Sequence, residues 1–143
     1  MACAWFSDAD KEEPFEILKE GRYTVQLGHW REEHRGNYDC LIFPFSVNGK
    51  SNIVPHEIIL MRPISKEDKQ GIDLSRRILS QFYRCFGIAP DSDYATPDDF
   101  FHASGDVRIS RNASGYLNVS HYYPAKHIYN IDHNGGHQPI LEV

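Results

Sequence analysis

Hydrophobic and polar residues alternate along the first half of the chain, and this period of two predicts β-strands. The first such segment is 21–27, and a polar connection at 30–37 leads to the second, 38–47. Asn48-Gly49 follows and predicts a tight type I′ turn, because both of its positions take positive φ. The third strand, predicted over 52–62, therefore returns beside the second.

The hydrophobic period changes to that of a helix beyond Pro63. Hydrophobic residues recur at every fourth position from Leu74 to Phe86, which predicts an amphipathic helix over 73–86 that Gly87 ends. Thr96-Pro97 then has the pattern of a helix cap followed by a proline at the first helical position, and it predicts a short helical turn.

A last hairpin is predicted on either side of a turn at 112–115. Strict alternation along its second strand places Tyr116 and Tyr122 on the same face. Three strands, a helix and two strands, in this order, are the connectivity of the OB-fold, a five-stranded Greek-key barrel. The sequence therefore predicts a mainly β, OB-fold-like barrel whose closure removes the sheet edges.

The length of 143 residues fits one domain. We divide it into an acidic N-terminal arm at 1–20, the barrel at 21–123 and a polar, His-rich tail at 124–143. The arm has a net charge of −4 and segment 21–89 a net charge of +3, so the total of −5 hides a mildly basic body. The N-terminus lacks the apolar stretch of a secretory signal, and no run suits a membrane span, so we expect a cytoplasmic protein.

Several short motifs resemble those of phage and prophage OB-fold proteins associated with single-stranded DNA and recombination. They are Gly21-Arg-Tyr23-Thr-Val, Phe43-Pro-Phe45-Ser-Val, Leu79-Ser-Gln-Phe82-Tyr-Arg-Cys-Phe86-Gly-Ile, Asp98-Asp-Phe100, Gly105-Asp-Val107-Arg-Ile, Gly115-Tyr116-Leu-Asn118-Val and Tyr123-Pro. The resemblance covers about residues 17–126. It implies single-stranded DNA binding in phage or mobile-element replication or recombination, in the cytoplasm of a bacterial or phage-infected cell, with replication or recombination proteins as partners. Such proteins often end in an acidic docking tip, whereas Ile140-Leu-Glu-Val143 carries one acid.

Binding of single strands with little sequence preference needs aromatic faces for the bases and cations beside the phosphates. The candidate nucleic-acid-binding residues are Arg22, Trp30, Arg31, Arg35, Tyr38, Lys50, Arg62, Arg108, Arg111, Tyr116 and Tyr122. We expect Trp30 on the rim of the binding groove, because an exposed Trp in a polar loop is costly unless it serves a ligand. We also expect a homo-oligomer, because an incompletely closed barrel leaves edge strands to be paired.

Two other functions stay open from the sequence. The negative charge and the acidic arm favour a protein–protein interaction module or inhibitor of similar fold that binds no nucleic acid. A metal-dependent nuclease would use carboxylates such as Asp91, Asp93, Asp98 and Asp99, but acids of this kind also favour turns and the first turn of a helix. The chain has no P-loop, no G-x-S-x-G and no zinc-ligand motif, so we expect neither catalysis nor a metal or other cofactor.

Overall fold

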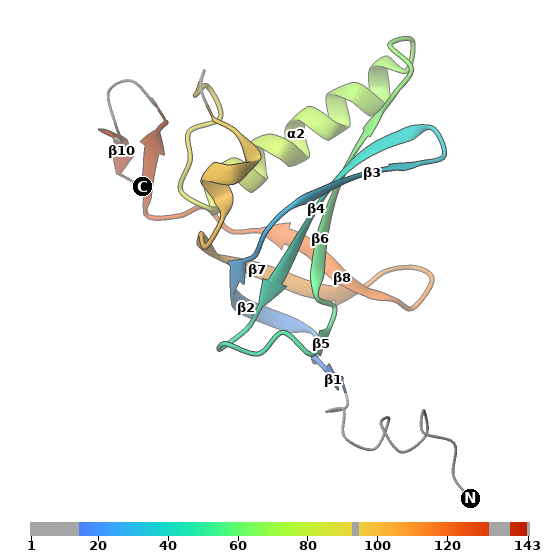
Figure 1. Ribbon diagram of the computed structural model, residues 1–143, viewed down its shortest axis with the longest axis vertical. Coiled ribbons are helices and arrows are strands. Elements are labelled where there is room, and N and C mark those ends of the chain that lie inside the picture. Colours follow the sequence, from blue (N-terminus) through green and yellow to red (C-terminus); the bar gives the residue numbers. More distant parts are fainter. Residues whose placement is uncertain (1–14, 93–94, 132–137, 143) are drawn as a thin grey trace, which may run out of the picture.

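The computed structural model describes residues 15–92, 95–131 and 138–142, and it is mainly β with one α-helix (Figure 1). The elements are β1 (Glu16–Ile17), β2 (Gly21–Leu27), β3 (Arg31–Arg35), β4 (Tyr38–Ser46), β5 (Ile53–Val54), β6 (Glu57–Pro63), α2 (Lys69–Cys85), the 3-10 turn η1 (Pro97–Phe100), β7 (Ser104–Arg111), β8 (Leu117–Tyr122), β9 (His127–Asn130) and β10 (Gln138–Glu142). Within these ranges no helix has the length and apolar character needed to cross a membrane.

Six of the strands form one antiparallel sheet in which β4 is the central element. Its first part pairs with β3 on one side and β6 on the other, and its last two residues pair with β2. The sheet continues from β2 to β7 and then to β8, while α2 packs against β6, β7 and β8. No pairing among the described residues joins β8 to β6. The sheet is therefore open, and the predicted closed barrel is not confirmed.

The strand predictions are confirmed for β2 and β4, and the turn between β4 and β5 has the predicted geometry. Asn48 and Gly49 take φ values of 52° and 78°. The predicted polar connection at 30–37 is wrong, because Arg31–Arg35 form β3 and pair with β4 residue by residue. This strand lies at a sheet edge and its side chains are all polar or charged, so it lacks the hydrophobic alternation by which strands are recognised.

The helix begins earlier than the hydrophobic period predicted. Its N-cap is Asp68, whose side chain accepts a hydrogen bond from the backbone N–H of Gly71, so α2 starts at Lys69. Gly87 takes a φ of +81° and ends the helix as predicted. The backbone N–H of Ile88 then bonds to the carbonyl of Tyr83, which completes a Schellman motif. The early turns lie beyond the core, since Leu74 is 57% exposed.

The segment after Pro124 is also more ordered than the predicted polar tail. Residues of β9 pair with β10, and Ile128 and Ile131 are buried. Tyr129 exchanges two backbone hydrogen bonds of 2.8 Å, one with the carbonyl of Gly87 and one with the N–H of Ala89. These contacts attach the segment to the end of α2. Ile128 and Ile131 are three positions apart, so the segment shows no strand alternation that could have predicted this.

Aromatic rings from the helix and the sheet fill the core. The ring of Phe82 on α2 lies 5.0 Å from that of Phe43 on β4, 4.9 Å from Phe100 in η1 and 4.8 Å from Phe86. Phe43, Phe45, Phe82 and Phe86 are all buried, as are the unpaired cysteines Cys40 and Cys85.

A β-bulge in β8 reverses the predicted orientation of Tyr122. Arg108 pairs with His121 but Ile109 pairs with Val119, so Ser120 is an extra residue on β8. The bulge puts Tyr122 on the inner face, where its ring meets that of Phe82 edge-on at 5.9 Å. Burial raises the pKa of Tyr122. The prediction that Tyr116 and Tyr122 share a face is therefore wrong.

The buried Tyr122 hydroxyl predicts a specific loss of stability in alkali. Its pKa is raised above the ordinary value of 10.0, so the unfolded chain loses this proton first and stability falls as the pH rises above 10. Cys85, whose pKa burial raises from 9.0 to about 12, acts in the same direction. Tyr122→Phe keeps the ring and removes the titrating group. We expect urea unfolding to show a pH slope above pH 10 that is shallower by up to about 1.4 kcal/mol per pH unit.

Tyr116→Phe, at an exposed position, is the matched control for this measurement. An unchanged slope in Tyr122→Phe would mean that the Tyr122 hydroxyl is not held neutral by the fold.

Candidate nucleic-acid interface

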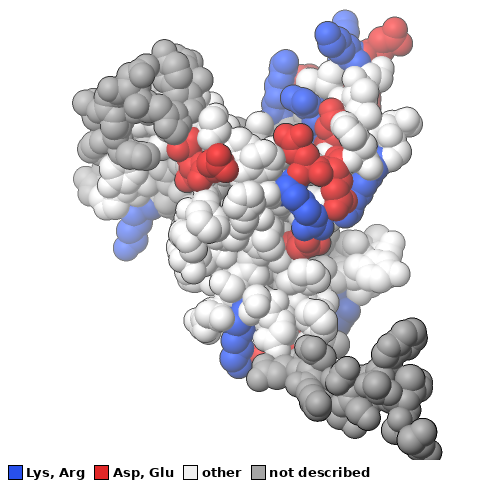
Figure 2. All heavy atoms as spheres, viewed as in Figure 1, with Lys and Arg blue, Asp and Glu red and all other residues white. Residues whose placement is uncertain are grey.

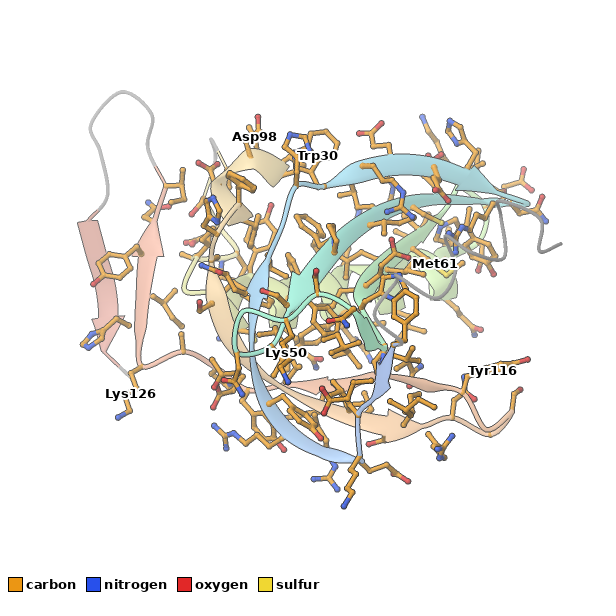
Figure 3. The ribbon with its side chains drawn as sticks, turned by 60° about the horizontal axis from the view of Figure 1, so that its bottom comes forward. Trp30, Lys50, Met61, Asp98, Tyr116 and Lys126 are labelled. Atoms are coloured by element: carbon orange, nitrogen blue, oxygen red, sulfur yellow. The ribbon has the colours of Figure 1, made fainter. Side chains whose placement is uncertain are left out.

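The candidate residues lie on separate parts of the molecule. Figure 3 shows Trp30 beside Asp98 at one end of the sheet and Tyr116 at the tip of the β7–β8 hairpin, far from it. Some of the residues face the core, some lie on the outer face of β3, β4 and β6, and some lie on the outer face of β2, β7 and β8 or at the tip of the β7–β8 hairpin. Two others lie at the margins of the sheet. The candidate residues therefore do not line a single groove.

Trp30 is one of the residues that face the core. It lies in the bend between β2 and β3, where it is half-buried and packs against the core cluster. Its indole N–H donates a 2.7 Å hydrogen bond to the Asp98 carboxylate, and the ring of His29 is stacked parallel to the indole. The exposed position that the sequence suggested for Trp30 is therefore wrong, because its polar neighbours belong to strand β3 and to a bend that folds onto η1.

Arg31 and Arg35 lie on the outer face of β3, β4 and β6, where both form ion pairs with carboxylates. Glu33 accepts from Arg31 at 3.0 Å and from Arg35 at 2.9 Å, and Arg31 also donates to Glu57 at 2.5 Å. The bond to Glu57 and that to Glu33 raise the pKa of the Arg31 guanidinium. The same two arginines lower the pKa of Glu33. Tyr38, 40% exposed, is the aromatic candidate on this face.

Two further candidate cations are paired at the margins of the sheet. Arg62 approaches Asp39 at 3.9 Å, and Lys50, beside the Asn48-Gly49 turn, approaches Glu16 at 3.6 Å. Neither lies on the outer face of β2, β7 and β8.

The outer face of β2, β7 and β8, called here the hairpin face, brings together side chains that can carry positive charge. Arg22 on β2 pairs with Arg108 on β7, and Arg108 pairs with His121 on β8. The three lie directly opposite one another across three strands. Cations in such positions repel one another, so an anion bound over this row would relieve an unfavourable arrangement.

One acid, Asp106, lies beside this row, opposite Thr24 on β2, and its carboxylate binds Arg22. The Arg22 guanidinium donates to the Asp106 carboxylate at 3.0 Å, and the Thr24 hydroxyl donates to it at 2.6 Å. The bond from Thr24, followed by that from Arg22, lowers the pKa of Asp106. Within the described part of the chain Arg108 has no acidic partner, so it is the cation of this face most accessible to a phosphate.

Aromatic rings complete the hairpin face. The Arg22 guanidinium lies 4.0 Å from the centre of the Tyr123 ring, and the His121 ring meets Tyr123 edge-on at 4.6 Å. At the hairpin tip the side chain of Asn112 accepts from the backbone N–H of Tyr116 at 3.0 Å, and this bond holds the turn. Tyr116 is 74% exposed there.

The sequence holds a signal for this face that strand periodicity does not reveal. Residues 107–131 contain no Asp or Glu, although the chain has 20 of them. Figure 2 shows the consequence, since the lobe that this hairpin forms carries no acidic atoms in that view, whereas acids and bases mix over β3, β4 and β6. An acid-free stretch of this length could have pointed to His121 and Tyr123, which were not among the candidates.

Two of the carboxylates considered for metal binding have other partners. Asp98 accepts from Trp30, and Asp99 accepts from the backbone N–H of Thr96 at 2.7 Å in a capping box. Asp93 lies outside the described residues. In the described ranges no three His, Cys, Asp or Glu side chains come together in a way that could hold a metal ion.

Comparison with known proteins finds no matching family model and no similar curated protein.

The position of Trp30 predicts a structural effect of its removal. Because its ring packs on the core and its N–H bonds to Asp98, we expect Trp30→Ala to lower the free energy of unfolding by about 2–3 kcal/mol, somewhat less than for a fully buried aromatic residue. Trp30→Phe keeps a ring and removes the hydrogen bond, and should cost about 1 kcal/mol. Both values come from urea unfolding. If Trp30→Ala left stability unchanged and weakened oligonucleotide binding, Trp30 would be a nucleic-acid-binding residue and not a packing residue.

Proposed function

We propose that this protein binds single-stranded DNA with little sequence preference through the hairpin face and the tip of the β7–β8 hairpin. The observation that carries the proposal is the cross-strand row of Arg22, Arg108 and His121, beside which Asp106 pairs with Arg22 and residues 107–131 contain no Asp or Glu. A polyanion neutralises such a row, and phosphates contacting cations supply most of the sequence-independent affinity of nucleic-acid-binding proteins.

The aromatic side chains of the same face favour a single strand over a duplex. Tyr116 presents its ring at an exposed tip, and Tyr123 lies beside the Arg22 guanidinium and the His121 ring. Bases stack on such rings only when they are unpaired, and stacking tolerates any base because each has a π-face. The combination of phosphate contacts and stacking therefore supports binding of single strands without sequence readout.

The connectivity of the chain is in keeping with this proposal. Within the six-stranded main sheet, counting β2 with β3 as one bent strand leaves five strands with α2 between the third and the fourth, an order like that of the OB-fold. OB-folds bind oligonucleotides partly with the loop between their last two strands, and in this chain that loop is the 112–116 tip. The resemblance to phage and prophage proteins would place the activity in replication or recombination.

Binding should depend on Tyr116 and Arg108 in different ways. We expect Tyr116→Ala to weaken binding of a fluorescent oligo-dT by about 1–3 kcal/mol, since it removes one stacking surface. Arg108→Ala should weaken binding and reduce the slope of log affinity against log salt by about 0.7, the value for one phosphate contact on a single strand. Fluorescence anisotropy at several salt concentrations measures both effects.

Matched controls come from similar residues on other surfaces. Tyr129→Ala on β9 and Arg77→Ala on α2 replace exposed residues away from the hairpin face and should bind like the wild type. Equal losses in the controls, or no binding at low salt, would refute the proposal and leave a protein–protein module. Degradation of the oligonucleotide with Mg²⁺ would instead favour the nuclease.

A further inference from the structure

The outer face of β3, β4 and β6 presents apolar side chains beside charged ones. Cross-strand pairing places Cys40 next to Met61 and Ile42 next to Ile59. Cys40 and Ile42 are buried on this face, whereas Ile59 is 39% and Met61 45% exposed. With Tyr38 at 40%, three partly exposed apolar side chains lie on a surface away from the hairpin face.

Four charged side chains cross this surface in a continuous row of alternating sign, called here the ion-pair row. Its order is Arg35, Glu33, Arg31 and Glu57, and contacts of 2.9, 3.0 and 2.5 Å join successive members. The row starts at the end of β3 that turns into β4 and ends on β6, so it passes over β4 and the buried Ile42.

We propose that a second copy of this chain docks on this face. An alternating row of four charges is complementary to itself when it is reversed. A two-fold axis that lies in the interface and crosses the row between Glu33 and Arg31 sets Arg35 opposite Glu57 of the second copy. The same axis sets Glu33 opposite Arg31 of the second copy, so all four positions face an opposite charge.

The apolar side chains and the strand edge support the same arrangement. Docking face to face buries Met61, Ile59 and Tyr38, whose exposure in one chain is unfavourable. The free edge of β3 carries five charged or His side chains in succession, Arg31–Arg35, and charged edges oppose pairing of strands edge to edge. The second copy therefore fits the face and not the edge, and a symmetric dimer uses the same patch twice.

The test changes the order of the four charges. Two double variants rearrange this order while keeping the same composition and net charge. Arg35→Glu with Glu33→Arg gives the order minus, plus, plus, minus, which places like charges opposite each other in the reversed copy. Glu33→Arg with Arg31→Glu gives plus, plus, minus, minus, which stays complementary to its reverse. Sedimentation equilibrium of the full-length chain without DNA should show a dimer for the wild type and the second variant. For the first variant we expect a dissociation constant at least about tenfold weaker.

The comparison separates docking from effects within one chain. The first variant keeps two of the three contacts inside the row and the second keeps one, so a loss of stability within the chain would weaken the second variant more. Met61→Glu should also abolish the dimer, whereas Leu74→Glu, on the exposed start of α2, should not. A wild type that stays monomeric at every concentration reached, or equal association of the two double variants, would overturn the proposal. Urea unfolding checks that each variant is folded.

Discussion

The ring of Phe82 contacts rings from three other parts of the chain, and these contacts hold the helix to the sheet. Phe43 comes from β4, Phe100 from η1 and Tyr122 from β8. Because Phe100 is buried, η1 is fixed close to the sheet, and its Asp98 meets the indole of Trp30. A residue that looked like a ligand contact is thus part of the same packing as the core, and it lies at the side of the molecule where acids are common.

The contact of Phe82 with Tyr122 also decides which side chains face solvent on the hairpin. Tyr122 reaches the core because Ser120 is an extra residue in β8. The residues on either side of Tyr122 then point outward, and this places His121 and Tyr123 next to Arg108 and Arg22. Without the bulge, strict alternation would place Tyr122 outward and turn its two neighbours inward. The cationic row therefore depends on one inserted serine as much as on the arginines.

Hydrophobic period predicted β2, β4 and most of α2, because each of these elements packs on one core. It failed for β3, whose residues face solvent, and for the start of α2, which Asp68 fixes by capping and not by burial. It also failed for Tyr122, since no pattern in one sequence marks a β-bulge. Of the site, the sequence supplied Arg22, Arg108 and Tyr116, but a list of cations could not show which of them are already paired with acids. Arg111 lies opposite Leu117, and its guanidinium donates to the carbonyl of Gly115, so it is not part of the cross-strand row. The pairing of Arg31 and Arg35 with Glu33 depends on the strand that was missed.

Net charge is a poor guide to what this surface can bind. The chain carries −5 overall, yet residues 1–20 alone contribute −4. At physiological salt the Debye length is about 8 Å, so a phosphate at the hairpin responds to charges within about that distance and hardly to distant acids. On the hairpin face those charges are Arg22, Arg108 and Asp106. Asp106 offsets Arg22, to which it is bonded, and Arg108 keeps its charge free for an anion. The distribution of acids along the chain, and not their number, thus makes one face of an acidic protein cationic.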